Sequence, residues 1–226
     1  LNGNLVGSMR TGYKQTNLSL GDGGASKDVS NSTQYPDANL TVNHTSLDFS
    51  QGMITSTGQE TDFAISGQGF FLVQQIQDAV ALAAPNMVTR DGELHFADIP
   101  ALGGKVLMTH SGLVALRDSS GTGAGPYTPI LYNDFKNNNF RPSIVMPNDT
   151  LDSLKFSNKG ATVFDFQNGF GLAPNARLVE QSLESSNSDL AQSLTAMSLH
   201  TKKFAAMAAE LKIEQTNLQT VIDLIK

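Results

Sequence analysis

Apolar residues recur at every seventh position over the last part of the chain. The repeat runs without a break through Leu190, Met197, Phe204, Leu211, Leu218 and Ile225. Glycine and proline, which interrupt helices, are both absent from residue 186 to the end of the sequence. We therefore predict one helix over residues 187–225, with Ser186 and Asp189 at its N-terminal cap.

A second position of this repeat carries both polar and apolar residues, such as Thr201 and Ile222. A strict seven-residue repeat keeps facing one partner only if the helix supercoils against another helix. The helix would also be about 58 Å long, more than the width of a small domain. We therefore predict a coiled coil; the alternative is an amphipathic helix lying on the chain's own domain. The predicted assembly interface consists of Leu190, Leu194, Met197, Phe204, Leu211, Leu218, Ile222 and Ile225.

The middle of the chain alternates short apolar runs with glycine-rich turns. These runs occupy residues 62–65, 70–73, 105–109, 113–116 and 161–166. Runs of four to six residues, rich in aromatic and β-branched side chains and bounded by turn residues, are typical of β-strands. The stretch before Pro85 is either a short helix or a long loop.

The predicted fold class is α+β, a small mainly β domain followed by a long C-terminal helix that pairs in a coiled coil. Residues 1–44 are polar and glycine-rich, which predicts a connector. Residues 45–175 form the predicted β domain, and residues 176–226 form a C-terminal helical assembly segment.

Candidate chemistry is sparse. The four histidines stand in separate segments without an evident acidic or histidine partner, so each is interpreted as a surface or turn residue: His44, His95, His110 and His200. Cysteine is absent, and no nucleotide-binding or nucleophile-elbow motif occurs. We therefore predict no enzyme, no catalytic residue, no metal site and no cofactor.

Charge and hydropathy argue against two further partners, nucleic acids and membranes. The net charge is −6 and no basic stripe exists, which argues against nucleic-acid binding. No apolar run approaches the roughly 20 residues that a spanning helix needs, so we predict no direct membrane insertion. The sequence also shows no pattern of a cleaved signal peptide.

Several motifs, in order, resemble the signature of flagellar rod and hook proteins. That family carries "QG…TG…D-x-A-I-x-G-x-G-F-F-x-V" at the start of its β domain, followed by "TRDG". The matching residues here are Gln51, Gly52, Gly58, Asp62, Gly67, Gly69, Phe70, Phe71, Arg90, Asp91 and Gly92. Near the C-terminus, residues 183–190 are similar to "LE-x-SNVDL", and residues 11–14 are similar to "TGFK". The chain departs from the family pattern at residues 6–9 and 200–204.

The resemblance implies a structural subunit of the bacterial flagellar basal body. In this family the N- and C-terminal helices pair as a coiled coil around a hollow tube, and the subunits stack helically. An N-terminal helix upstream of Leu1 would then be the partner of the predicted seam. The implied partners are further copies of the chain and other rod and hook proteins, and export uses the flagellar type III apparatus without a cleaved signal.

Length favours a rod subunit, because hook subunits of the family usually carry an additional outer domain. The alternatives are a hook-type subunit and a secreted β-domain binding module that is oligomerised by its coiled coil. A glycan-binding module would need an aromatic platform, and the chain has no tryptophan and four tyrosines.

Overall fold

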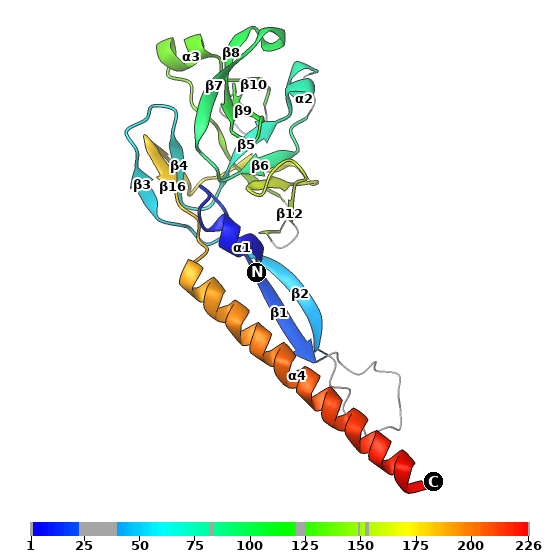
Figure 1. Cartoon of the computed structure of the whole chain (residues 1–226). Helices are drawn as coiled ribbons and strands as arrows, with labels where there is room; N and C mark the ends of the chain where they lie inside the picture. Colours follow the sequence, from blue (N-terminus) through cyan, green and yellow to red (C-terminus); the bar gives the residue numbers. More distant parts are fainter. Residues whose placement is uncertain are drawn as a thin grey trace.

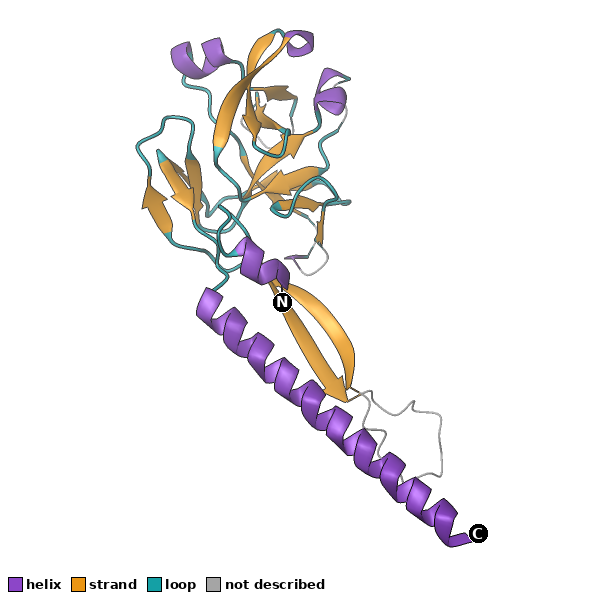
Figure 2. Ribbon diagram, viewed as in Figure 1, coloured by secondary structure: helices purple, strands orange, loops and turns teal. Residues whose placement is uncertain are grey.

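The computed structural model describes residues 2–22, 40–81, 84–120, 125–148, 150–151 and 154–225. It is mainly β with one long C-terminal helix, which confirms that part of the predicted fold. Figure 1 shows a β domain at one end of the molecule, with the long helix and a two-stranded hairpin extending away from it. Figure 2 shows that the domain consists mainly of strands and loops, with a few short helices. Within the described residues, no helix is long and apolar enough to cross a membrane.

The domain is built on one antiparallel sheet, in which seven strands follow the order β12-β13-β6-β5-β9-β8-β7. Their bounds are β5 Phe70–Gln74, β6 Met87–Thr89, β7 Leu94–Ile99, β8 Gly104–Thr109, β9 Val114–Asp118, β12 Lys155–Phe156 and β13 Val163–Asp165. Three further strands join its sides, with β10 on β9, β11 on β5 and β14 on β11. They are β10 Tyr127–Pro129, β11 Ile144–Pro147 and β14 Phe170–Leu172.

The central strand β5 is apolar at successive positions because both of its faces are covered. Phe70 and Leu72 belong to one buried cluster, while Phe71 belongs to a second cluster that also contains Phe63 and Phe135. Neighbouring residues of a strand point to opposite faces of the sheet. The continuous apolar run that predicted this strand therefore reflects a sheet packed on both sides.

Three two-stranded ladders connect the domain to the ends of the chain. They pair β1 Gln15–Asp22 with β2 Leu40–Asp48, β3 Ile54–Ser56 with β16 Ser182–Glu184, and β4 Phe63–Ser66 with β15 Arg177–Glu180. The last two ladders return the chain to the start of the β domain just before the C-terminal helix begins. The N-terminal segment and the segment that leads into α4 therefore meet at one junction.

The helices are short except for the last one. They are α1 Asn2–Gly7, α2 Ile76–Val80, α3 Tyr132–Asn137 and α4 Leu190–Ile225, with a 3-10 turn over Pro100–Leu102. Of the two alternatives for the stretch before Pro85, the structure shows the short helix, α2. With 36 residues, α4 is about 54 Å long.

Two predicted segments contain elements that the prediction did not include. The predicted connector over residues 1–44 contains α1, β1 and part of β2 in its described residues. The predicted helical segment over residues 176–226 begins instead with β15 and β16, because this stretch pairs with strands of the β domain. Gln181 separates these two strands with a left-handed backbone (φ 52°).

The N-terminal end of α4 also differs from its prediction. The helix begins at Leu190, and the Asp189 carboxylate accepts the backbone N–H of Ala191 at 2.8 Å, as an N-cap residue does. Ser186 instead accepts the backbone N–H of Ser188 at 3.0 Å, ahead of the helix. The carboxylate therefore caps the helix directly and starts it three residues later than predicted.

Candidate assembly surface and its buried junction

The predicted seam on α4 is exposed to solvent. Leu190, Leu194, Met197, Phe204 and Leu211 expose between 40% and 59% of their surface. The side chains of Leu218, Ile222 and Ile225 lie outside the described residues. The structure thus places the described seam residues along one edge of the helix, where about half of their surface remains exposed.

A second group of apolar side chains lies on the other side of α4. Leu199, Ile213 and Leu224 expose 52%, 62% and 80% of their surface. At about 100° per residue they lie roughly opposite Met197 around the helix. Sequence reasoning missed this group because its seven-residue repeat is interrupted: Ala206, between Leu199 and Ile213, is small, and Leu224 is out of register. The described part of α4 therefore presents apolar surface in two directions.

The face of α4 that the rest of the chain protects is a third one. Ser193 is buried there, and Ala196, His200 and Met207 are half-buried. This protected stripe lies beside the predicted seam and carries mostly small or polar residues. The chain's own packing on α4 therefore uses positions other than those of the predicted seam.

A buried ionic cluster lies where the domain, the hairpin and α4 meet. The Glu184 carboxylate binds the Lys14 ammonium at 2.7 Å and the Arg90 guanidinium at 3.0 Å. At most 3% of any of these side chains is exposed. Charged groups at this depth are stable only when each has partners. Glu184 is the last residue of β16, so the cluster fixes the chain just before α4.

Backbone groups supply further hydrogen bonds to these three charges. The Lys14 ammonium also donates to the carbonyl oxygen of Ser50, and the Arg90 guanidinium donates to the carbonyl oxygen of Gly67, each at 2.7 Å. The Glu184 carboxylate accepts the backbone N–H of Gly52 at 2.9 Å. Burial lowers the pKa of Lys14, and the neighbouring Glu184 carboxylate opposes that shift.

Several residues of the family-like motif meet at this cluster. The Gln51 side chain donates to the carbonyl oxygen of Ile65 at 2.9 Å and accepts the backbone N–H of Gly67 at 3.0 Å. A side chain at Gly52 would overlap the carbonyl oxygen of Ser185, and one at Gly92 would overlap that of Phe63. These glycines are therefore required by close backbone approach.

The remaining motif residues lie in turns or in the core. The Asp62 carboxylate accepts the hydroxyl of Thr57 at 2.6 Å, beside the positive-φ turn at Gly58. Gly69 approaches the side chain of Ile144. Phe70 and Phe71 fill the two faces of the central strand.

Asp91 ties the motif to the N-terminal segment. Its carboxylate accepts the hydroxyl of Thr11 at 2.7 Å and the backbone N–H of Glu93 at 3.1 Å. Burial raises the pKa of Asp91, and these hydrogen bonds counteract part of that shift.

A second set of hydrogen bonds holds the segment that leads into α4. The Asn187 side chain donates to the carbonyl oxygen of Asp48 at 2.6 Å and accepts the backbone N–H of Gln15 at 2.7 Å. The Ser188 hydroxyl donates to the carbonyl oxygen of Asn4 in α1 at 3.1 Å. The start of α4 is thus bound to both strands of the hairpin and to the first helix.

Sequence reasoning did not find this ionic junction. Lys14 and Glu184 belong to two separate sequence motifs and are 170 residues apart in the chain. The sequence signal for such a junction is a charged residue inside an otherwise apolar or glycine-rich motif. Which charged residues contact one another is known only from the fold.

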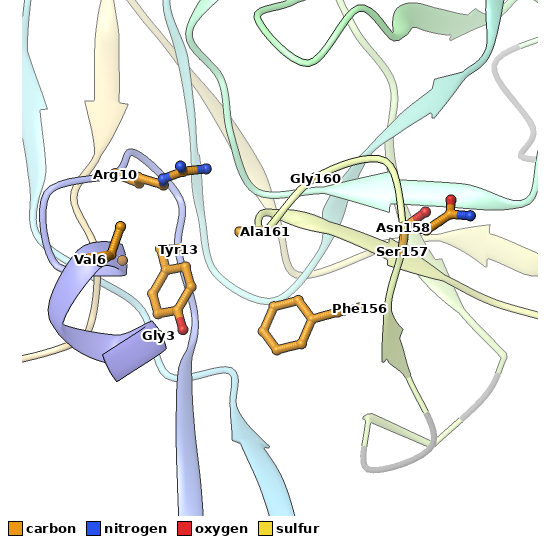
Figure 3. Close-up of a pocket in the computed structure, with 10 residues that line it drawn as sticks. Gly3, Val6, Arg10, Tyr13, Phe156, Ser157, Asn158, Gly160 and Ala161 are labelled. Atoms are coloured by element: carbon orange, nitrogen blue, oxygen red, sulfur yellow. The ribbon is translucent and has the colours of Figure 1, made fainter. Parts of the chain in front are cut away.

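An open groove of about 460 Å³ lies beside the junction, between α1 and the segment that follows β12. Figure 3 shows Tyr13 and Phe156 in this groove, with their rings stacked at 6.3 Å between centroids. Its described lining includes Val6 and Arg10. The groove therefore offers mainly apolar contact area.

The structure corrects one sequence interpretation of the histidines. His95 and His110 are neighbours, with ring centroids 4.9 Å apart, because β7 pairs with β8. Within the described residues, no three histidine, aspartate or glutamate side chains are grouped as a metal site.

Comparison with known proteins found no matching family model and no matching curated protein.

Proposed function

We propose that this chain is a structural subunit of the bacterial flagellar rod, which assembles into a helical, hollow axial tube through its terminal helices. The observation that carries the proposal is the exposed apolar seam on a helix that extends away from its own domain. The motif resemblance supplies the identity of the assembly. The role is architectural, and no catalytic group enters it.

Energetics support assembly through the seam. Full burial of one large apolar side chain contributes about 1.5–3 kcal/mol. Each described seam residue still exposes 40% or more of its surface, so a partner helix would recover a substantial part of that energy at every position. Several such contributions are needed, because association must offset the loss of rotational and translational freedom.

The two apolar sides of α4 suggest that the helix contacts more than one neighbour. One side would pair in a coiled coil through the seam, and the side carrying Leu199 and Ile213 would face a different subunit. A helix packed within the wall of a tube has neighbours in several directions. We propose further copies of the chain and other rod and hook proteins as these partners.

The junction supports the same role. A tube requires that each helix leave its domain at a fixed angle, since small angular errors accumulate along a helical stack. Glu184 and Asn187 bind the chain just ahead of α4 to elements on several sides. The proposed location is the basal-body rod, reached by type III export.

The experiment is electron microscopy of the purified full-length protein. Phe204→Asp and Leu211→Asp place a carboxylate in the seam, and we expect both variants to fold but to form no tubes. Ala205→Asp is the matched control, because it introduces the same charge on the exposed helix face about 100° from Phe204. Normal tubes from both seam variants would contradict the proposal.

A further inference from the structure

The hairpin of β7 and β8 brings two histidines together on the surface of the β domain. His95 lies opposite Met108 in the ladder, so His110 is two residues further along the partner strand and on the same face. Both side chains are exposed, and their rings are 4.9 Å apart between centroids with 44° between the ring planes. This pair belongs neither to the assembly surface nor to the junction.

A backbone contact selects the tautomer of one neutral ring. The Nδ1 atom of His110 lies 3.1 Å from the carbonyl oxygen of Glu93. A carbonyl oxygen can only accept, so Nδ1 carries the hydrogen, and in the neutral ring Nε2 keeps a free lone pair. Histidines that bind metals usually have their second ring nitrogen held in this way.

The spacing of the rings fits chelation of one metal ion. Metal–nitrogen bonds of about 2.0–2.1 Å put the metal about 3.2 Å from each ring centroid, so N–metal–N angles of about 90–110° correspond to centroids about 4.5–5.2 Å apart. The observed 4.9 Å falls inside that range. The separation of the two rings therefore requires no rearrangement of the strands for them to share one ion.

We propose that His95 and His110 form a two-histidine site for a late first-row divalent cation, with Cu²⁺ bound most tightly. Imidazole nitrogens suit copper, nickel and zinc, and affinity for such ligands is greatest for Cu²⁺ in this series. Water completes the coordination, since the described residues offer no third grouped side chain. The solvent-exposed position leaves room for those waters. The proposal is independent of the flagellar assignment.

The test is a titration of the full chain with Cu²⁺, followed by calorimetry and electron paramagnetic resonance. We expect His95→Ala and His110→Ala each to weaken binding of one equivalent by at least about tenfold, because either change removes half of the chelate. His200→Ala, on α4, is the matched control and should leave the affinity unchanged. Both target residues are exposed, so circular dichroism should show the fold intact.

A second measurement separates the chelate from scattered binding at single histidines. Substoichiometric Cu²⁺ should broaden the imidazole resonances of His95 and His110 together, and those of His200 much later. Zn²⁺ titrated in the same way should bind more weakly to the same two residues. Broadening of only one of the pair, or a loss of less than about twofold in either single variant, would overturn the proposal.

Discussion

At the scale of single residues, the most consequential feature is one carboxylate shared by two buried cations. Glu184 pairs with both Lys14 and Arg90, while the carbonyl oxygens of Ser50 and Gly67 accept further hydrogen bonds from them. Such a cluster contributes little net stability over an apolar alternative, but it penalises any arrangement in which its members separate. The cluster therefore specifies how the N-terminal segment meets the segment that leads into α4.

Glu184→Gln should destabilise the fold strongly. The substitution keeps the shape of the side chain but leaves two buried cations without a counter-charge, and breaking a buried pair in this way costs about 3–5 kcal/mol. Urea unfolding measures the loss. Glu180→Gln is the control, because Glu180 pairs with Arg141 while 49% exposed, and loss of an exposed pair costs below about 1 kcal/mol. Equal losses of unfolding free energy in the two variants would show that the buried charges of the junction contribute no more to stability than an exposed ion pair does.

Asp91→Asn should change the pH dependence of stability. Burial raises the pKa of Asp91, so the folded chain binds a proton at this site more tightly than the unfolded chain does. This carboxyl therefore lowers stability as pH rises from its unfolded pKa through its folded pKa. Asparagine removes the charge and keeps the oxygen that accepts from Thr11 and Glu93.

We accordingly expect the Asp91→Asn variant to be more stable than the parent near neutral pH. The difference should shrink as pH falls through the raised pKa and become small near about pH 4. Urea unfolding at several pH values measures it. A variant that is less stable at neutral pH, by an amount that disappears as pH falls, would contradict this prediction and indicate that the charge itself stabilises the turn.

At the scale of elements, the sequence was informative where one local rule decides the structure. The glycine-free heptad segment predicted α4, and the apolar runs predicted β5, β8 and β9, because a strand buried on both faces is apolar at most of its positions. Residues 177–184 were missed because their structure depends on pairing with β3 and β4, more than 100 residues earlier in the chain. Their local pattern does not distinguish a strand from the start of a helix.

The candidate sites also differ in whether the sequence alone could predict them. Seam positions could be read from periodicity, since a repeat on a helix fixes which residues share a face. The Lys14–Glu184–Arg90 cluster and the His95–His110 pair could not, because each joins segments that only the fold brings together. For the histidines a partial signal existed. Two strands joined by a short connection, with histidines near their far ends, place those histidines close together once the register is known.

At the scale of the whole molecule, the described chain combines a well-packed domain with a helix that has few partners of its own. The domain core is closed, as residues such as Phe63 and Leu72 have no exposed surface. By contrast, most described side chains of α4 beyond Met207 are exposed. An isolated helix with little tertiary contact is only marginally stable in water. The two parts should therefore differ widely in local stability.

Hydrogen exchange tests this difference and its link to assembly. In the monomer, amides of α4 beyond Met207 should exchange close to the rate of an unstructured peptide, while those of β5 and β9 stay protected. If the seam is buried between subunits, assembly should slow exchange in the same part of α4 by at least about 100-fold, equivalent to about 2.7 kcal/mol. The Phe204→Asp variant should keep the protection of β5 and gain none in α4 at the same concentration. Protection of distal α4 in the monomer equal to that of β5 would mean that the helix needs no partner, and the exposed seam would then have to serve something other than assembly.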